Sequence, residues 1–221
     1  MSSQRIYSLL RRAVVLSVLP LTLAAVIPTK AQASLYSTTV RDLDNATGYW
    51  RLGESSGTTA IDSSILGNYN GIYNGGVTLG QSGAIFNDPD PAASFDGIND
   101  YVQTYLDSNL PELTIEAWFK SDVNWGERSI VDSDVSGHYG HSLIQGYWNG
   151  DSSLDVQHHD GQYDSPFNVQ PGVWYHAVAR FMSGNVDLHV NGTLIGSKTF
   201  VQSTPDGDNF RIGRHNVFDP Q

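Results

Sequence analysis

One string in the sequence could be half of a calcium-binding loop. Asp132-Ser-Asp134-Val-Ser136-Gly137 follows the spacing of the first six positions of an EF-hand loop. The twelfth position, where such a loop needs a bidentate glutamate, is Leu143. We therefore expect a turn here. Other calcium ligands would have to lie in turns rich in Asp and Asn, because the ion takes six to eight oxygen ligands.

Cleavage of a glycosidic bond needs two carboxylates that flank the bond, about 5 to 9 Å apart. Alternate positions of one strand would place such a pair on one face, but the sequence has no Glu-x-Asp-x-Glu string. Glu116 is the only carboxylate in the segment 113–120, where it shares a face with Thr114, Trp118 and Lys120. We expect a surface salt bridge between Glu116 and Lys120 and no catalytic acid.

Seven histidines raise the possibility of zinc or nucleophilic chemistry. No His-Glu-x-x-His or Gly-x-Ser-x-Gly string is present, and there is no cysteine. His158 and His159 are adjacent, so on a strand they point to opposite faces and cannot chelate one metal together. His176 shares a face with Trp174, Val178 and Arg180, and we expect a packed or hydrogen-bonded histidine there.

Aromatic residues in the middle of the chain are the best candidates for a ligand surface. Sugar binding needs exposed aromatic rings beside hydrogen-bonding groups, because a sugar ring has an apolar face and polar hydroxyls. The alternative is that these rings belong to the core, since Trp and Tyr are usually mostly buried. The predicted ligand-binding residues are Trp125, Tyr139, His141, Tyr147, Trp148, Asn149 and Tyr163.

These residues lie among many short apolar segments separated by Gly, Asn, Asp or Pro, a pattern typical of an antiparallel sandwich or jelly roll. The clearest local signal is 186–195, where Val186, Leu188 and Val190 alternate with polar residues before Asn191-Gly192. Asn-Gly is the preferred pair for a tight hairpin turn. The predicted strands are 48–53, 71–79, 92–95, 100–106, 113–120, 128–131, 141–148, 154–158, 173–181, 186–190, 193–198 and 209–213.

The first 33 residues have the features of a secretory signal peptide. Three arginines precede an apolar run at 13–27, and Ala31-Gln32-Ala33 supplies a cleavage site. The run is shorter than the roughly 20 apolar residues that a membrane-spanning helix needs. We expect cleavage after Ala33, a short polar lead over 34–45, and an extracellular or periplasmic protein that is not inserted in a membrane.

The mature chain is expected to be strongly acidic. Removal of four basic residues with the leader leaves 8 basic against 23 acidic side chains, a net charge of −15. Nucleic acid and anionic membrane surfaces are therefore poor partners. With no cysteine, an exported chain has no disulfides to stabilise it, so its stability must come from its core.

Several strings resemble the laminin-G-like jelly-roll family of secreted bacterial proteins, within the concanavalin A-like lectin/glucanase superfamily. In the order of that family the chain contains YWRLGESSGTTAIDSS, ASFDGINDYV, LTIEAWFK, VWYHAVARF, VDLHVNGTLIG and FRIGR. The resemblance implies an all-β fold of two stacked antiparallel sheets over 46–221, often with calcium at the rim. It places the calcium ligands at Asp62, Asp96, Asn99 and Asp100, although Asp96-Gly97 is equally typical of a simple turn.

The chain departs from the family after the FRIGR string. Members usually continue into a last strand resembling Gly-x-Ile-Asp-Glu-Val, whereas this sequence ends at Gln221. Either the chain is truncated or its ending differs, and we expect the first strand to be left at an exposed edge.

These observations together predict a secreted, non-catalytic module, stabilised by calcium, that binds carbohydrate or another cell-surface ligand. A glycoside hydrolase or polysaccharide lyase on the same fold is one alternative. A structural or adhesive surface protein is another, because fold alone does not fix function.

Overall fold

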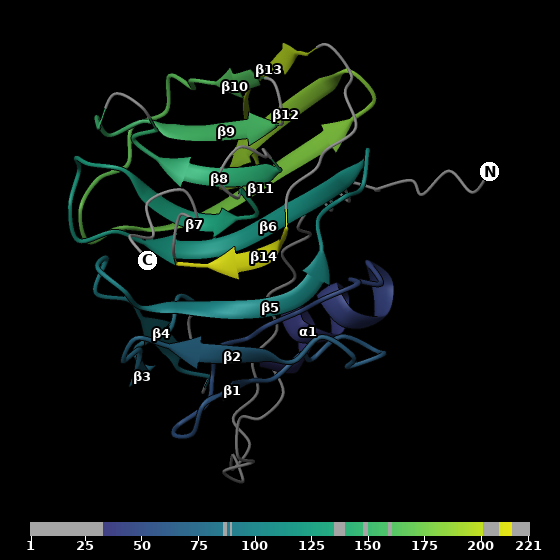
Figure 1. The fold of residues 1–221 in the computed structure, drawn as a ribbon, viewed down its shortest axis with the longest axis vertical. Helices are drawn as coiled ribbons and strands as arrows, with labels where there is room; N and C mark the ends of the chain where they lie inside the picture. Colours follow the sequence, from purple (N-terminus) through teal and green to yellow (C-terminus); the bar gives the residue numbers. More distant parts are fainter. Residues whose placement is uncertain are drawn as a thin grey trace, which may run out of the picture.

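The computed structural model describes residues 33–85, 88, 90–134, 140–147, 150–158, 161–200 and 208–213. Two antiparallel sheets are stacked face to face, and the strands of the larger sheet follow one another from β10 near the top of Figure 1 to β1 near the bottom. The predicted all-β, two-sheet class is therefore confirmed. Among the described residues no helix is long and apolar enough to cross a membrane.

The larger sheet has eight strands, in the order β1-β2-β5-β14-β7-β8-β9-β10. Its bounds, in that order, are Thr59–Ala60, Gly71–Asn74, Tyr101–Asp107, Asn209–Ile212, Arg128–Asp132, His141–Gln145, Leu154–His158 and Gly161–Tyr163. Strand β14 is late in the sequence but lies between β5 and β7, so it joins the two halves of this sheet.

The smaller sheet has four strands, in the order β13-β12-β11-β6. These strands are Thr193–Thr199, Asn185–Val190, Trp174–Met182 and Leu113–Lys120. The predicted hairpin is confirmed: β12 and β13 pair across Asn191 and Gly192, whose φ angles of 50° and 76° are those that the Asn-Gly turn requires. A separate two-stranded ribbon joins β3 (Thr78–Gln81) and β4 (Ala92–Ser94).

The main core lies between the two sheets and is made by alternate residues of their strands. In β11 the inward residues are buried and the outward ones partly exposed, as period-2 alternation predicts. The buried members of this cluster are Ile115, Phe119, Leu143, Leu154, Val156, Val169, Tyr175, Ala177, Ala179, Phe181, Val186, Leu188, Val190 and Phe210.

A second, smaller cluster fills the inner side of β1, β2 and β5, beyond the reach of the four-stranded sheet. Ala60, Tyr73 and Val102 are its buried centre. Trp50 and Leu52 pack against it from a loop, and Trp50 forms only an isolated bridge with Asp62. The predicted strand at 48–53 was therefore wrong, because the left-handed φ of 55° at Leu52 bends the chain out of an extended conformation.

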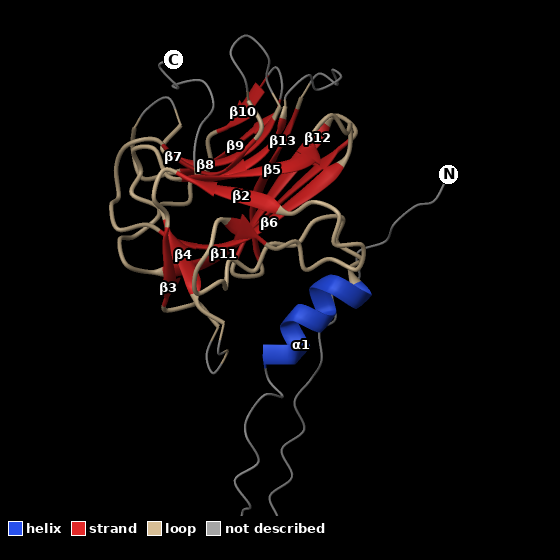
Figure 2. Cartoon of the chain, turned by 60° about the horizontal axis from the view of Figure 1, so that its bottom comes forward, coloured by secondary structure: helices blue, strands red, loops and turns tan. Residues whose placement is uncertain are grey.

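The described chain begins with a short helical segment, α1 (Ala33–Thr38), followed by the short π-helix η1 (Thr39–Leu43). Figure 2 shows α1 outside the sandwich, away from the eight-stranded sheet. Side-chain contacts of Tyr36 join it to the outer face of β6. No helix was predicted here, since 34–45 was expected to be a polar lead.

Candidate functional site

Strand β5 presents two tyrosines and a glutamine on the outer face of the eight-stranded sheet. Val102 and Thr104 point inward and are fully buried, so Tyr101, Gln103 and Tyr105 alternate with them and point outward. Tyr105 is 53% exposed, and the other two are half-buried. Side chains two residues apart on a strand lie roughly 7 Å apart, so the two rings flank the amide of Gln103.

Strand β14 adds an arginine to the same surface. Arg211 pairs in register with Gln103 of β5 on one side and with Asp132 of β7 on the other. Its Nε donates a hydrogen bond of 2.7 Å to Oε1 of Gln103, and its guanidinium lies 5.5 Å from the ring centre of Tyr101. We call Tyr101, Gln103, Tyr105 and Arg211 the outer-face patch.

The row of polar side chains that includes Gln103 and Arg211 continues into β7, β8 and β9, where it is buried. Ser142 of β8 donates a short hydrogen bond to Oδ1 of Asp132 and pairs in register with Gln157 of β9. Asp132 and Ser142 are fully enclosed, and Gln157 is 5% exposed. Asp134, two residues beyond Asp132, is also fully buried, and its Oδ1 accepts a 2.6 Å hydrogen bond from the N–H of Gly140.

Two carboxylates in this half of the sheet hold their protons unusually tightly. Burial, followed by repulsion from Asp132, raises the pKa of Asp134 to about 7. Burial also raises the pKa of Asp155 to about 6, although that side chain accepts hydrogen bonds from the backbone N–H groups of Tyr147 and Ser165. Both groups are enclosed, so they organise loops and do not face solvent.

The four predicted ligand-binding residues that the structure describes do not form one exposed surface. His141 is fully buried in the core, where its ring lies 4.5 Å from that of Phe181. Tyr147 is 7% exposed, and Tyr163 packs against the main core. Tyr139, Trp148 and Asn149 lie outside the described residues.

Trp125 is the one exception among the described candidates. It is 63% exposed at the rim of the sandwich, and the guanidinium of Arg128 lies 5.9 Å from its ring centre. The Arg128 side chain also lies beside Gly97, so Trp125 and the loop at Asp96 belong to one end of the molecule. We call Trp125 and Arg128 the rim pair.

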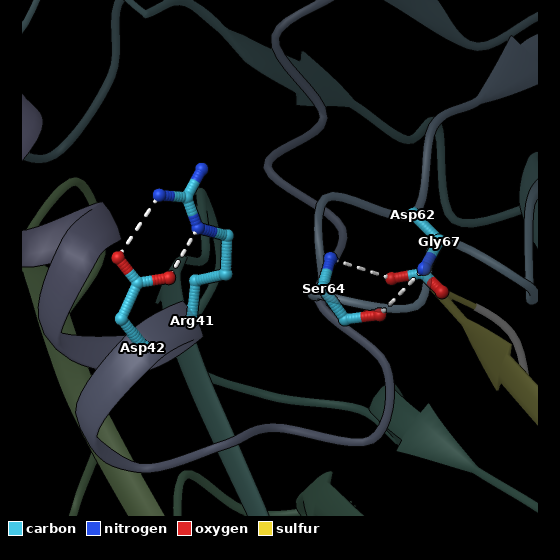
Figure 3. A network of polar contacts seen from close by, with 5 residues as sticks. All are labelled: Arg41, Asp42, Asp62, Ser64 and Gly67. Carbon is cyan, nitrogen blue, oxygen red and sulfur yellow. Dashed lines mark hydrogen bonds and ion pairs between the residues drawn. The ribbon is translucent and has the colours of Figure 1, made fainter.

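The candidate calcium ligands bind backbone N–H groups. Oδ1 of Asp62 accepts hydrogen bonds from Tyr49 and Ser64, at 3.0 and 2.9 Å, and Oδ2 accepts one of 3.0 Å from Tyr69. Figure 3 shows its contact with Ser64, whose hydroxyl in turn accepts from Gly67. Burial alone would raise the pKa of Asp62, but these N–H groups outweigh it and hold the pKa below its usual value.

The Asp96 to Asp100 loop is organised in the same way. Oδ1 of Asp96 accepts from the N–H groups of Ile98, Asn99 and Asp100, and Oδ2 of Asp100 accepts from the N–H of Asp96. Within the described part of the chain, no three acidic or histidine side chains converge on one point. The oxygens of these residues thus serve the turns themselves, which is a poor fit to a calcium cage of six to eight ligands.

This geometry gives a prediction that separates the two roles of Asp62. Replacement by asparagine puts an amide N–H where Oδ2 accepts from Tyr69, so Asp62→Asn should cost about 1 to 3 kcal/mol of unfolding free energy. If Asp62 does no more than accept these backbone hydrogen bonds, a chelator leaves the melting temperature of the native protein unchanged. A chelator-induced drop that added Ca²⁺ reverses, absent in Asp62→Asn, would instead show that Asp62 holds calcium.

Two expectations for the smaller sheet had different outcomes. His176 is a hydrogen-bonded strand histidine, as predicted, with Nε2 2.8 Å from Oε1 of Glu116. The predicted Glu116–Lys120 salt bridge was wrong: Glu116 contacts His176, and Lys120 lies over the ring of Trp174 at 5.3 Å. Both contacts run across the strands: His176 is a diagonal neighbour of Glu116, whose direct partner in β11 is Val178, and Trp174 is the direct partner of Lys120.

The outer-face patch was not predicted, since the expected ligand residues lay in or near loops. The sequence contains a signal for it, because Tyr and Gln at 101, 103 and 105 alternate with Val and Thr at 102 and 104. The contribution of Arg211 needed the topology, because β14 is more than 100 residues from β5 along the chain.

Comparisons with known proteins agree with the fold. The sequence profile of the concanavalin A-like lectin/glucanases superfamily matches residues 96–221. A search of curated proteins finds no match. Among solved structures, a Trypanosoma rangeli sialidase variant with trans-sialidase activity is 12% identical with a TM-score of 0.54, over 86% of this chain and 33% of that one.

Two smaller proteins are also similar in structure. Domain 4 of the extracellular arabinanase AbnA from Geobacillus stearothermophilus, in complex with arabinotriose, is 18% identical, with a TM-score of 0.46 over 79% of this chain and 74% of that domain. The carbohydrate-binding domain of a Ruminococcus gnavus sialidase, bound to sialyllactose, is 16% identical, with a TM-score of 0.41. The alignment covers 50% of this chain and 67% of that domain.

Several of the matched proteins are much longer than the part that corresponds to this chain. The aligned region is a third of the sialidase and 31% of a Bacteroides ovatus protein. At these identities the likeness concerns the fold alone. The profile match, which extends over more than half of the sequence, shows that the chain belongs to the concanavalin A-like lectin/glucanase superfamily.

Proposed function

We propose that this protein is an exported, non-catalytic module that binds carbohydrate on the outer-face patch. The observation that carries the proposal is the arrangement of Tyr101, Gln103, Tyr105 and Arg211 on two neighbouring strands. The exposed ring of Tyr105 and the half-buried ring of Tyr101 can stack on the apolar faces of sugars, while the amide and the guanidinium can bond to hydroxyls.

The patch is rigid, which favours binding. All four side chains stand on strands of a continuous sheet, and Arg211 is already fixed by Gln103 and Tyr101. Little side-chain freedom therefore remains to be lost when a ligand binds, and such preorganisation increases affinity. The fold neighbours that are bound to arabinotriose and sialyllactose make carbohydrate a reasonable ligand class to test first.

The positions of the carboxylates support binding more than cleavage. The two acids with a raised pKa, Asp134 and Asp155, are 0% and 1% exposed, so a polysaccharide cannot approach them. No carboxylate forms part of the outer-face patch itself. A glycosidase would need an accessible acid and an accessible base on opposite sides of the bond.

The binding test begins with a screen of the purified protein on a glycan array. The best-binding oligosaccharide is then titrated calorimetrically into Tyr105→Ala, which removes the most exposed ring of the patch. We expect at least a tenfold loss of affinity, equivalent to about 1.4 kcal/mol, because an exposed aromatic anchor is lost.

Trp125→Ala is the matched control, since Trp125 is an exposed aromatic residue at the rim, 63% exposed against 53% for Tyr105. It should leave the affinity within about twofold of the wild type. Loss of binding in Trp125→Ala with none in Tyr105→Ala would move the ligand to the rim pair and refute the patch.

Catalysis is tested on the same polysaccharides. The proposal expects neither new reducing ends nor unsaturated products above a heat-denatured control. Steady release of either product by the wild type would establish a hydrolase or a lyase in place of a binding module.

Export is part of the proposal and rests on the sequence of residues 1–33. It predicts that the protein recovered from outside the cytoplasm begins at Ser34, which N-terminal sequencing would show. A recovered protein that still begins at Met1, inside the cell, would contradict it.

A further inference from the structure

The outer face of the four-stranded sheet holds a second group of aromatic and polar side chains. In register across β6 and β11, Trp118 pairs with His176, and Lys120 pairs with Trp174. Trp118 is 39% exposed. We call Glu116, Trp118, Trp174 and His176 the platform.

Contacts within the platform fix its geometry. The rings of Trp118 and His176 are stacked, with centres 4.9 Å apart and planes inclined by 29°. His176 also holds the carboxylate of Glu116 through the 2.8 Å contact of its Nε2. Burial alone would raise the pKa of Glu116, but bonds from His176 and Tyr36 outweigh it, so the carboxylate stays ionised as an acceptor beside the indole.

A residue from the start of the described chain already occupies this position. The hydroxyl of Tyr36 in α1 donates a 2.8 Å hydrogen bond to Oε1 of Glu116. Its ring meets that of Trp118 edge-on, with centres 6.5 Å apart and planes at 78°. Tyr36 thus presents to the platform a six-membered ring and a hydroxyl, the two features that a sugar presents.

The contact between Tyr36 and the platform lies at the surface of the molecule. The hydrogen bond between Tyr36 and Glu116 is exposed to solvent. The ion pair of the segment, Arg41 with Asp42 (Figure 3), is internal and adds nothing across the interface. Val40 is buried, but Leu43 is 76% exposed, and neither α1 nor η1 pairs with a strand. Segments held by contacts at the surface open more easily than the strands of the core.

We infer that the platform is a second binding surface for a neutral carbohydrate, and that the segment 36–43 is a displaceable cover whose Tyr36 stands in the place of the sugar. A ring of the ligand would lie against Trp118, and one of its hydroxyls would donate to Glu116 as Tyr36 does. The choice of carbohydrate rests on the proposed function, whereas the displacement of Tyr36 does not.

The experiment uses the protein that begins at Ser34. It carries Tyr105→Ala, so that the outer-face patch no longer contributes to binding. Cellohexaose, laminarihexaose and xylohexaose are titrated into it and into the same protein carrying Tyr36→Ala. Removal of the cover should strengthen binding of at least one of them about fivefold, as expected for a surface that is open about one-fifth of the time. Adding Glu116→Gln or Trp118→Ala should abolish this gain.

Leu43→Ala is the matched control, because it alters an exposed residue of the same segment and leaves Tyr36 in place. It should not change the affinity. The Trp118 indole N–H resonance, assigned with Trp118→Phe, should shift in Tyr36→Ala and shift again on sugar addition. Unchanged affinity for all three sugars in Tyr36→Ala, or a gain that survives Glu116→Gln and Trp118→Ala, would overturn the inference.

These outcomes are separable from a failure of the proposed function. If Tyr105→Ala in the protein with an intact Tyr36 loses no affinity for the array ligand, the outer-face patch is refuted whatever the platform does. If that patch is supported and removal of Tyr36 changes neither affinity nor the Trp118 resonance, the platform alone is refuted.

Discussion

Replacing Asp134 with asparagine is expected to raise the free energy of unfolding at pH 8 by on the order of 3 kcal/mol. Asp134 is fully enclosed beside Asp132, and its pKa is raised from 3.8 to about 7. Each unit of such a shift corresponds to about 1.36 kcal/mol. Asparagine keeps an oxygen for the N–H of Gly140 and removes the second buried charge.

The same shift fixes the pH dependence of the wild type. Because the folded state holds the Asp134 proton more tightly than the unfolded state does, its contribution is fully present below about pH 4 and is lost as pH rises toward 7. Asp155, whose pKa is about 6, acts in the same direction. Asp62 acts in the opposite direction, since its lowered pKa makes its contribution fall in acid. The wild type should therefore be more stable at pH 5 than at pH 8.

Urea unfolding of the two proteins at both pH values checks this prediction. The wild type should lose stability between pH 5 and pH 8, and Asp134→Asn should lose much less, with Asp155 responsible for the remainder. Asp122→Asn, at an exposed position, is the control and should behave as the wild type does. An Asp134→Asn protein that is no more stable at pH 8, with the wild-type pH dependence intact, would rule out the buried pair as its source.

Phe181→Ala is expected to cost about 3 to 5 kcal/mol, a large part of the stability of a domain of this size. Phe181 is 1% exposed and pairs with Leu113 of β6 and Val186 of β12. Across the core its ring meets that of His141 at 4.5 Å. Truncation would leave a cavity beside two buried imidazoles, those of His141 and His158.

Denaturant unfolding of Phe181→Ala measures this cost. Met182→Ala is the matched control, since Met182 is the next residue of β11 but is 37% exposed, and it should change stability by less than about 1 kcal/mol. Equal losses of stability in the two variants would show that Phe181 is not buried between the two sheets.

The four-stranded sheet was almost fully predictable from the sequence. Segment 113–120 alternates apolar and polar residues because only one face is covered, and the strand has those bounds. The Asn191-Gly192 hairpin was equally clear. The short pieces β1 and β10 were missed, because strands of two or three residues have too few positions for alternation to show.

The candidate site was harder to predict, for reasons visible in β8 and β9. Every residue of these two strands is buried, so His141, Ser142 and Gln157 carry no alternation that distinguishes the core from the outer face. His141 was expected on the ligand surface as a hydrogen-bonding side chain beside the aromatic rings, yet it packs between Phe181 and His158. The pairing of Arg211 with Gln103 depends on a contact between distant parts of the chain, which a local pattern cannot contain.

The central claim is that carbohydrate binds on the outer face of the eight-stranded sheet, and backbone amide NMR titration tests it most directly. With the best array ligand added to the isotope-labelled protein, the account predicts that the largest shifts fall on Tyr101–Asp107 and Asn209–Ile212, saturating with one binding curve. Shifts confined to the loops around Trp125 and Gly150, with β5 and β14 unchanged, would contradict it.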